Sequence, residues 1–207
     1  LPAASGIEAT DFLGYEKLES ESKVVVIWKN QERVNQVKGG EEIFLACDQT
    51  PFYAEAGGQV GDKGQFASES ATGNILDCKR QGKVFIHKIK LKKGTIKTGD
   101  VIKMSVEKEK RSAIAIHHSS THLVHAALRE VLGDHVQQKG SLVDENKLRF
   151  DFSHSKPLTN DEISRIEEIV NREILKNLEV ETKLMKLEDA LNSGAMALFG
   201  EKYDDDV

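Results

Sequence analysis

The stretch DVIKMSVEKEKRSAIAIHHSSTHLVHAALREVL, Asp100–Leu132, decides the fold of this chain because its hydrophobic period changes partway along. Up to about Val106, apolar and polar residues alternate, as they do in a half-buried strand. After Glu107 the apolar residues recur with the period of a helix. The sequence therefore predicts a boundary at residues 106/107, with strands before it and a mixture of helices and strands after it.

The two sides of this boundary predict two domains of one α+β chain. Over residues 1–106, short segments such as KVVVIWK, EEIFLAC and KVFIHKIKL are separated by Gly-rich turns, a pattern typical of a small β-barrel. Over residues 107–207, we expect helices packed on an antiparallel sheet. This second domain comprises a helix, the hairpin GSLVDENKLRFDF, a helix that opens with the capping box Thr159 to Glu162, the strand VETKLMKL and the helical stretch EDALNSGAMALFG.

Composition excludes several classes of protein. The chain is 39% hydrophobic and 30% charged with 3 Pro, as in an ordinary globular protein. No apolar run reaches the roughly 18 residues of a membrane span and nothing resembles a signal peptide, so we expect a cytoplasmic protein without a membrane partner. Cys47 and Cys78 lack paired spacing, which argues for reduced thiols.

Charge is unevenly distributed along the chain. From Lys79 to Arg111 there are 12 Lys or Arg against 3 Asp or Glu, a local charge of +9, whereas the net charge of the chain is -5. Such a segment is what contact with a nucleic-acid backbone requires. Lysines that alternate with apolar residues are also typical of the solvated face of a strand, and the sequence leaves both interpretations open.

Histidines gather on the helix expected over Ile116–Leu132. At about 100° per residue, His118, His122, His125 and Arg129 form one stripe. The opposite side, which we expect to pack on the sheet while the imidazoles face a cleft or solvent, carries Ile116, Leu123, Val124, Ala127, Leu128 and Val131. Two His at i and i+4 can share a zinc ion, although four-coordination needs two further ligands. A polar helix face is the alternative.

Longer motifs carry a more specific resemblance. HSSTHLVHAALREVLGDHVQQKGSLV, LRFDFSH and the upstream DQTPFYAEAGGQVGDKG together resemble the editing region of the alanyl-tRNA synthetase family. The resemblance covers nearly the whole chain. It implies an internal fragment: the aminoacylation domain, which uses ATP and Mg, would precede Leu1, and a dimerising domain would follow Val207. The implied partner is the acceptor end of tRNA(Ala), and no DNA is expected.

The family's editing site hydrolyses alanine tRNA mischarged with serine or glycine, and the resemblance places its parts here. Zinc would be held by His118 and His122 together with a CxxxH that lies beyond this chain, so the fragment alone should be inactive. Thr121 and Gln138 match residues of the editing pocket, where a hydroxyl such as that of Thr121 could read the hydroxyl of serine. The loop Gly57, Gly58 and Gln59 matches one that leans over the substrate.

Other possibilities remain beside this one. The glycine loop is equally consistent with a tight turn that needs positive φ. Zinc could activate the attacking water or hold the amino group of the substrate. Departures from the commoner family pattern occur at His117, Ser119 and Ser120, and His117 lies about 100° from His118 on the helix, away from the metal pair. A free-standing trans-editing deacylase and a non-catalytic RNA-binding module are the alternative functions.

Overall fold

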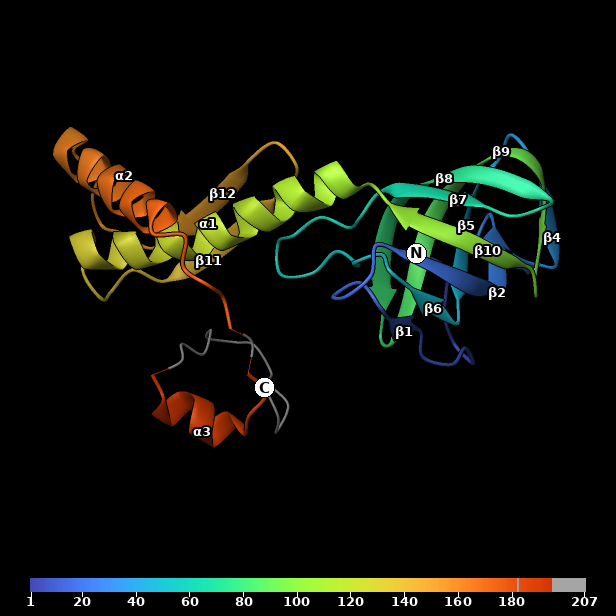
Figure 1. The fold of residues 1–207 in the computed structure, drawn as a ribbon, viewed down its shortest axis with the longest axis horizontal. Coiled ribbons are helices and arrows are strands. Elements are labelled where there is room, and N and C mark those ends of the chain that lie inside the picture. Colours follow the sequence, from blue (N-terminus) through green and yellow to red (C-terminus); the bar gives the residue numbers. More distant parts are fainter. Residues whose placement is uncertain (182, 195–207) are drawn as a thin grey trace. The chain divides into compact units, whose positions relative to one another are not determined.

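The structure is a computed structural model that describes residues 1–181 and 183–194 (Figure 1). The chain forms two compact units. The first comprises residues 1–121 and 140–149, and the second comprises 122–139 and the chain from 150 onward. The division passes through the long helix α1 (Lys108–Leu132), whereas the change in sequence pattern that predicts a boundary lies just before this helix.

The strands before α1 occupy most of the first 106 residues. They are β1 (Asp11–Phe12), β2 (Glu19–Lys29), β3 (Glu32–Val34), β4 (Gln36–Lys38), β5 (Glu42–Cys47), β6 (Gln49–Thr50), β7 (Gly64–Ala67), β8 (Ala71–Gln81), β9 (Val84–Lys97) and β10 (Val101–Val106). After α1 come β11 (Gln138–Val143), β12 (Leu148–Phe152), α2 (Asn160–Leu175) and α3 (Leu187–Asn192).

Six of these strands close into an antiparallel barrel. Neighbours pair in the order β10-β7-β8-β9-β5-β2, and β10 then pairs with β2 over Val101↔Lys23 to Ser105↔Glu19. This last pairing joins strands about 80 residues apart and leaves the sheet without free edges at that point. The predicted fold class, an α+β chain that begins with a small β-barrel, is confirmed.

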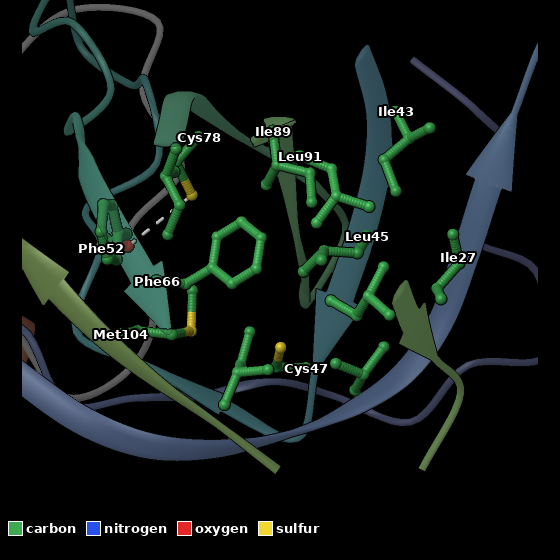
Figure 2. Close-up of a cluster of buried hydrophobic side chains, with 14 of the residues drawn as sticks. Ile27, Ile43, Leu45, Cys47, Phe52, Phe66, Cys78, Ile89, Leu91 and Met104 are labelled. Atoms are coloured by element: carbon green, nitrogen blue, oxygen red, sulfur yellow. Dashed lines mark hydrogen bonds between the residues drawn. The ribbon is translucent and has the colours of Figure 1, made fainter. Parts of the chain in front are cut away.

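Alternation along the strands fills the barrel. In β10 the side chains of Ile102 and Met104 are fully buried, while that of Val101, which precedes them and points to the other face, is 56% exposed. Figure 2 shows Met104 beside Phe66 in this core, with the Cys78 thiol directed at the carbonyl oxygen of Phe52. Burial of each large apolar side chain contributes roughly 1.5–3 kcal/mol, so the barrel core is the main source of stability in this part of the chain.

The second unit has a smaller core of its own. Ala127 and Leu128 of α1 and Val136 pack with Ile166 and Ile169 of α2. The predicted capping box begins α2: the Thr159 hydroxyl accepts from the backbone N–H of Glu162, and the Glu162 carboxylate accepts from that of Thr159. These bonds satisfy backbone donors that would otherwise lack partners at the helix start.

Other sequence predictions have mixed outcomes. The strand predicted over residues 180–187 stays a prediction, because residue 182 lies outside the described residues. Of the others, Lys186 forms a single β-bridge and Leu187 begins α3. The predicted helical stretch 188–200 extends past residue 194, outside the described residues. Cys47 and Cys78 are free and buried in the barrel, and burial raises the pKa of both thiols. In the described part of the chain, every helix is too short or too polar to cross a membrane.

Candidate functional site

The first turn of α1 is tied to the barrel by a buried ion pair. Arg111 pairs with Asp62, whose side chain is only 1% exposed, and also donates to the carbonyl oxygens of Gly14 (2.7 Å) and Pro51 (2.9 Å). Asp62 additionally accepts from the backbone N–H of Tyr53 at 2.7 Å. Because both charges have several partners, the pair fixes where the helix begins. The sequence alone did not predict this pair, because Asp62 lies in the upstream motif and Arg111 lies 49 residues further along the chain.

Burial along α1 differs from the predicted helix faces. His118 and His122 are exposed, as expected, but His125 is only 7% exposed, so the prediction that it shares their open face is wrong. Ile116, placed on the core side, is 65% exposed. The side chains that are buried on α1 are those of Ile114, Thr121, His125, Ala127 and Leu128. The buried face therefore includes polar residues that a wheel drawn from hydrophobicity assigns elsewhere.

His118 is bonded to the glycine loop of the barrel. Its Nδ1 lies 2.6 Å from Oε1 of Gln59. Because an amide oxygen only accepts, Nδ1 carries the hydrogen and donates it, and in the neutral ring the lone pair is then on Nε2. Nε2 with a free lone pair is the form in which imidazole binds a metal ion.

The loop Gly57–Gln59 has the backbone geometry of a tight turn. Both glycines have positive φ, 58° at Gly57 and 84° at Gly58. The loop also pairs with the end of β11: Val143 donates to the carbonyl of Gly58 at 2.8 Å and accepts from Val60 at 3.1 Å. A Cβ on Gly58 would lie 2.4 Å from the carbonyl oxygen of Ser141. Glycine is therefore required here for close approach of two backbones.

His117 faces a different partner from its neighbour. Its Nδ1 lies 2.7 Å from the carbonyl oxygen of Asp144, so it donates there. Asp144 forms the β11–β12 turn by accepting from the backbone N–H groups of Asn146 and Lys147, which lower the pKa of its carboxyl. His117 thus has a different partner from His118, and the prediction that it is not a zinc ligand stays a prediction.

The two predicted pocket residues lie in different parts of the fold. Thr121 is 8% exposed, and its hydroxyl donates to the carbonyl of His117 at 2.8 Å, so only its oxygen lone pairs remain for another group. Gln138 is the first residue of β11, partly buried, and belongs with His122 to the second compact unit. Within the first unit, the structure directly joins Gln59 and His118.

His125 is a buried imidazole that sequence reasoning took for a surface group. Its ring lies 5.1 Å from that of Phe150, and its Nε2 is buried without a hydrogen-bond partner among the described residues. Burial lowers the pKa of His125, while a hydrogen bond to the backbone of Val136 acts in the opposite direction. A neutral ring is therefore favoured at this position.

Folding pairs much of the basic segment with acids. Five of its 12 cations form ion pairs, and four of the acidic partners come from elsewhere in the barrel: Lys79–Glu55, Lys88–Glu42, Lys103–Glu19 and Arg111–Asp62, with Lys110–Glu107 inside the segment. Lys92 and Lys93 remain exposed on β9. The local charge is thus smaller on the folded surface than along the sequence.

The donor set fits part of a zinc site. His118 and His122 lie one helical turn apart on α1, and the bond from Nδ1 to Gln59 puts the lone pair of the neutral His118 ring on Nε2. Among residues 1–181 and 183–194, no cluster of three or more His, Cys, Asp or Glu could hold a metal ion. The described residues could therefore supply two imidazole ligands, half of a structural zinc shell.

Comparison with known proteins identifies the chain's relatives. Residues 3–110 match the family model described as tRNA synthetases class II (A). Alanine–tRNA ligase of Parvibaculum lavamentivorans is 52% identical over 203 residues, 97% of this chain, and that of Nitrosospira multiformis is 50% identical over 200 residues, 96% of it. The chain spans 23% of the length of each of these ligases.

Proposed function

Because this chain belongs to the tRNA synthetases of class II (A), we propose that it forms the editing region of an alanine–tRNA ligase. In the intact ligase, whose main reaction would be ATP- and Mg-dependent alanylation of tRNA(Ala), this region hydrolyses the ester of Ser-tRNA(Ala) or Gly-tRNA(Ala). The observation that carries the proposal is the pair His118 and His122 on α1, with His118 oriented by Gln59. The remaining zinc ligands come from outside the described residues.

Such a second site is needed because a pocket for alanine cannot strongly reject serine, which adds only a hydroxyl. In the proposed site, the lone pairs of Thr121 accept a hydrogen bond from the seryl hydroxyl, since its own hydrogen is donated to His117. An alanyl ester offers no donor there. A bond of this kind is worth about 1–1.5 kcal/mol, or roughly tenfold in rate, in favour of serine.

The other residues of the proposed site would bind zinc and contact the substrate. His118 and His122 would hold zinc through imidazole nitrogens, and we assign Gln138 to the editing pocket by its match to the family's motif. The chemistry that zinc would supply is activation of the attacking water or orientation of the substrate's amino group. Burial lowers the pKa of His125, which disfavours a positive charge on this ring.

The test uses an alanine–tRNA ligase that contains this segment. His118→Ala should lower both zinc content and the hydrolysis of Ser-tRNA(Ala) by about 100-fold or more, with alanylation unchanged, because each ligand of a two-imidazole pair is essential to affinity. His135→Ala, at an exposed histidine that bonds to His154, is the matched control. Equal zinc and equal hydrolysis in the His118→Ala and unsubstituted ligases would contradict the proposal and favour a non-catalytic RNA-binding role.

The 207-residue chain gives a second test. With two imidazoles it should bind zinc well below one equivalent after dialysis, and it should not hydrolyse Ser-tRNA(Ala). Elemental analysis and a deacylation assay measure both. One tightly bound zinc with rapid hydrolysis would mean that other residues of this chain complete the site.

A further inference from the structure

We propose that Gln59 is a positioning residue that locks His118 in the form able to bind zinc, an inference that rests on the proposed function. Gln59 Oε1 lies 2.6 Å from His118 Nδ1, well within hydrogen-bonding distance. A neutral imidazole has one N–H and one lone pair, and the partner of one nitrogen decides the state of the other. Gln59 therefore acts through His118 and not by contact with the substrate.

Gln59 can do this because its own position is fixed. Its backbone exchanges two hydrogen bonds with Ala56, at 2.9 and 3.2 Å, and the residue is 9% exposed. The backbone on both sides, at Gly58 and Val60, is bonded to Val143 at the end of β11. A buried amide on a doubly anchored loop loses little further entropy when it orients a histidine.

The close approach of this loop to β11 also explains why residue 58, just before Gln59, is a glycine. A side chain on Gly58 would run into the carbonyl oxygen of Ser141 and push the loop away from β11. Because Gln59 follows directly, such a shift would also move Oε1 away from His118. The Gly57–Gln59 loop thus works as one unit: glycine allows the close approach, and glutamine supplies the acceptor.

Two substitutions of Gln59 distinguish its role as a hydrogen-bond acceptor from its role in packing. Gln59→Leu keeps a side chain of similar size but has no acceptor. Gln59→Glu keeps an oxygen acceptor at the same position, and a carboxylate in this role increases the basicity of the ligand. Gln65, exposed on β7, provides the matched control through Gln65→Leu.

The direct readout is the tautomer of His118, which requires neither metal nor activity. In the metal-free 207-residue chain, two-bond ¹H–¹⁵N correlation spectra should show the hydrogen of His118 on Nδ1. Gln59→Leu should lose this preference, and Gln59→Glu and Gln65→Leu should retain it. A His118 hydrogen on Nε2 in the unsubstituted chain, or an unaltered tautomer in Gln59→Leu, would overturn the inference.

Zinc affinity in the ligase that contains this segment provides the second readout. Gln59→Leu should weaken zinc binding by about 10–100-fold in chelator competition, and Gln59→Glu should restore it, since partners of metal-binding histidines have effects of this size. Loss of zinc in Gln59→Glu as well would show a merely structural role. If His118→Ala leaves zinc unchanged, the proposed function fails; if His118→Ala removes zinc but Gln59→Leu does not, only the present inference fails.

Discussion

The barrel contains a histidine that should make the stability of this chain fall as the pH drops. His87 on β9 is completely buried, its Nε2 lies 2.9 Å from the Thr50 hydroxyl, and the ring of Phe52 meets it edge-on. Burial lowers the pKa of His87 to about 4, against 6.5 for an exposed histidine. Between these values the unfolded chain binds a proton that the folded chain does not.

The sign and the size of this effect on stability follow from the difference between the folded and unfolded pKa values of His87. Because the folded pKa is the lower one, the free energy of unfolding is highest above pH 6.5 and falls as the pH decreases toward 4. Full titration would cost about 3 kcal/mol, and the part between pH 6.5 and 4.5 is about 2 kcal/mol. For a protein of ordinary stability that is a substantial fraction of the total.

Urea unfolding of the 207-residue chain at pH 7, 6, 5 and 4.5 measures the effect. His87→Gln cannot titrate but can still bond to Thr50, so its free energy of unfolding should fall by about 2 kcal/mol less than that of the unsubstituted chain over this range. Gln65→Leu, at an exposed residue without a titratable group, is the control and should leave the pH dependence unchanged. Parallel pH profiles for His87→Gln and the unsubstituted chain would refute the reasoning.

Three further predictions follow from particular contacts. Arg111→Leu should destabilise the chain by about 3–5 kcal/mol in urea unfolding, because it leaves a buried carboxylate unpaired; a loss below 1 kcal/mol would contradict this. Gly58→Ala should cost more stability than Gly57→Ala, since only the former adds a clash to the shared cost of positive φ, about 1–2 kcal/mol; equal costs would argue against the close approach. In the ligase, reversing the charge of Lys92 and Lys93 should weaken tRNA binding and reduce its salt dependence, and an unchanged salt slope would mean that these lysines are only a solvated strand face.

The barrel could be predicted from the sequence because its information is local. Alternation in a segment such as Val101–Val106 determines which side chains point inward whatever the strand pairs with. The closure of the barrel could not be predicted in this way, because it does not depend on local sequence. The pairing of β10 with β2 depends on residues about 80 positions apart, and nothing in either strand alone specifies the other.

The helix faces were harder to predict because the surroundings of α1 are partly polar. A wheel assigns the core side by hydrophobicity, which placed Ile116 inside and His125 outside. In the structure, Thr121 is buried with its hydroxyl on a backbone carbonyl, and His125 is buried against Phe150. Both polar groups are tolerated because hydrogen bonds or ring contacts reduce the cost of burial. The sequence pattern predicted that the candidate ligands His118 and His122 are exposed, as they are in the structure. It did not predict the hydrogen bond from His118 to Gln59.

The adjacent histidines His117 and His118 on α1 show why residue spacing alone could not predict how each imidazole is oriented. Successive side chains on a helix diverge by about 100°, so His117 and His118 cannot share a partner. His117 reaches the carbonyl of Asp144 and His118 reaches Gln59, and these two partners belong to segments that are themselves joined, because Val143 pairs with the glycine loop. The two imidazoles therefore hold the β11–β12 turn and the barrel loop against the same helical turn. The position of the His118 imidazole, which we propose as a zinc ligand, therefore depends on both segments.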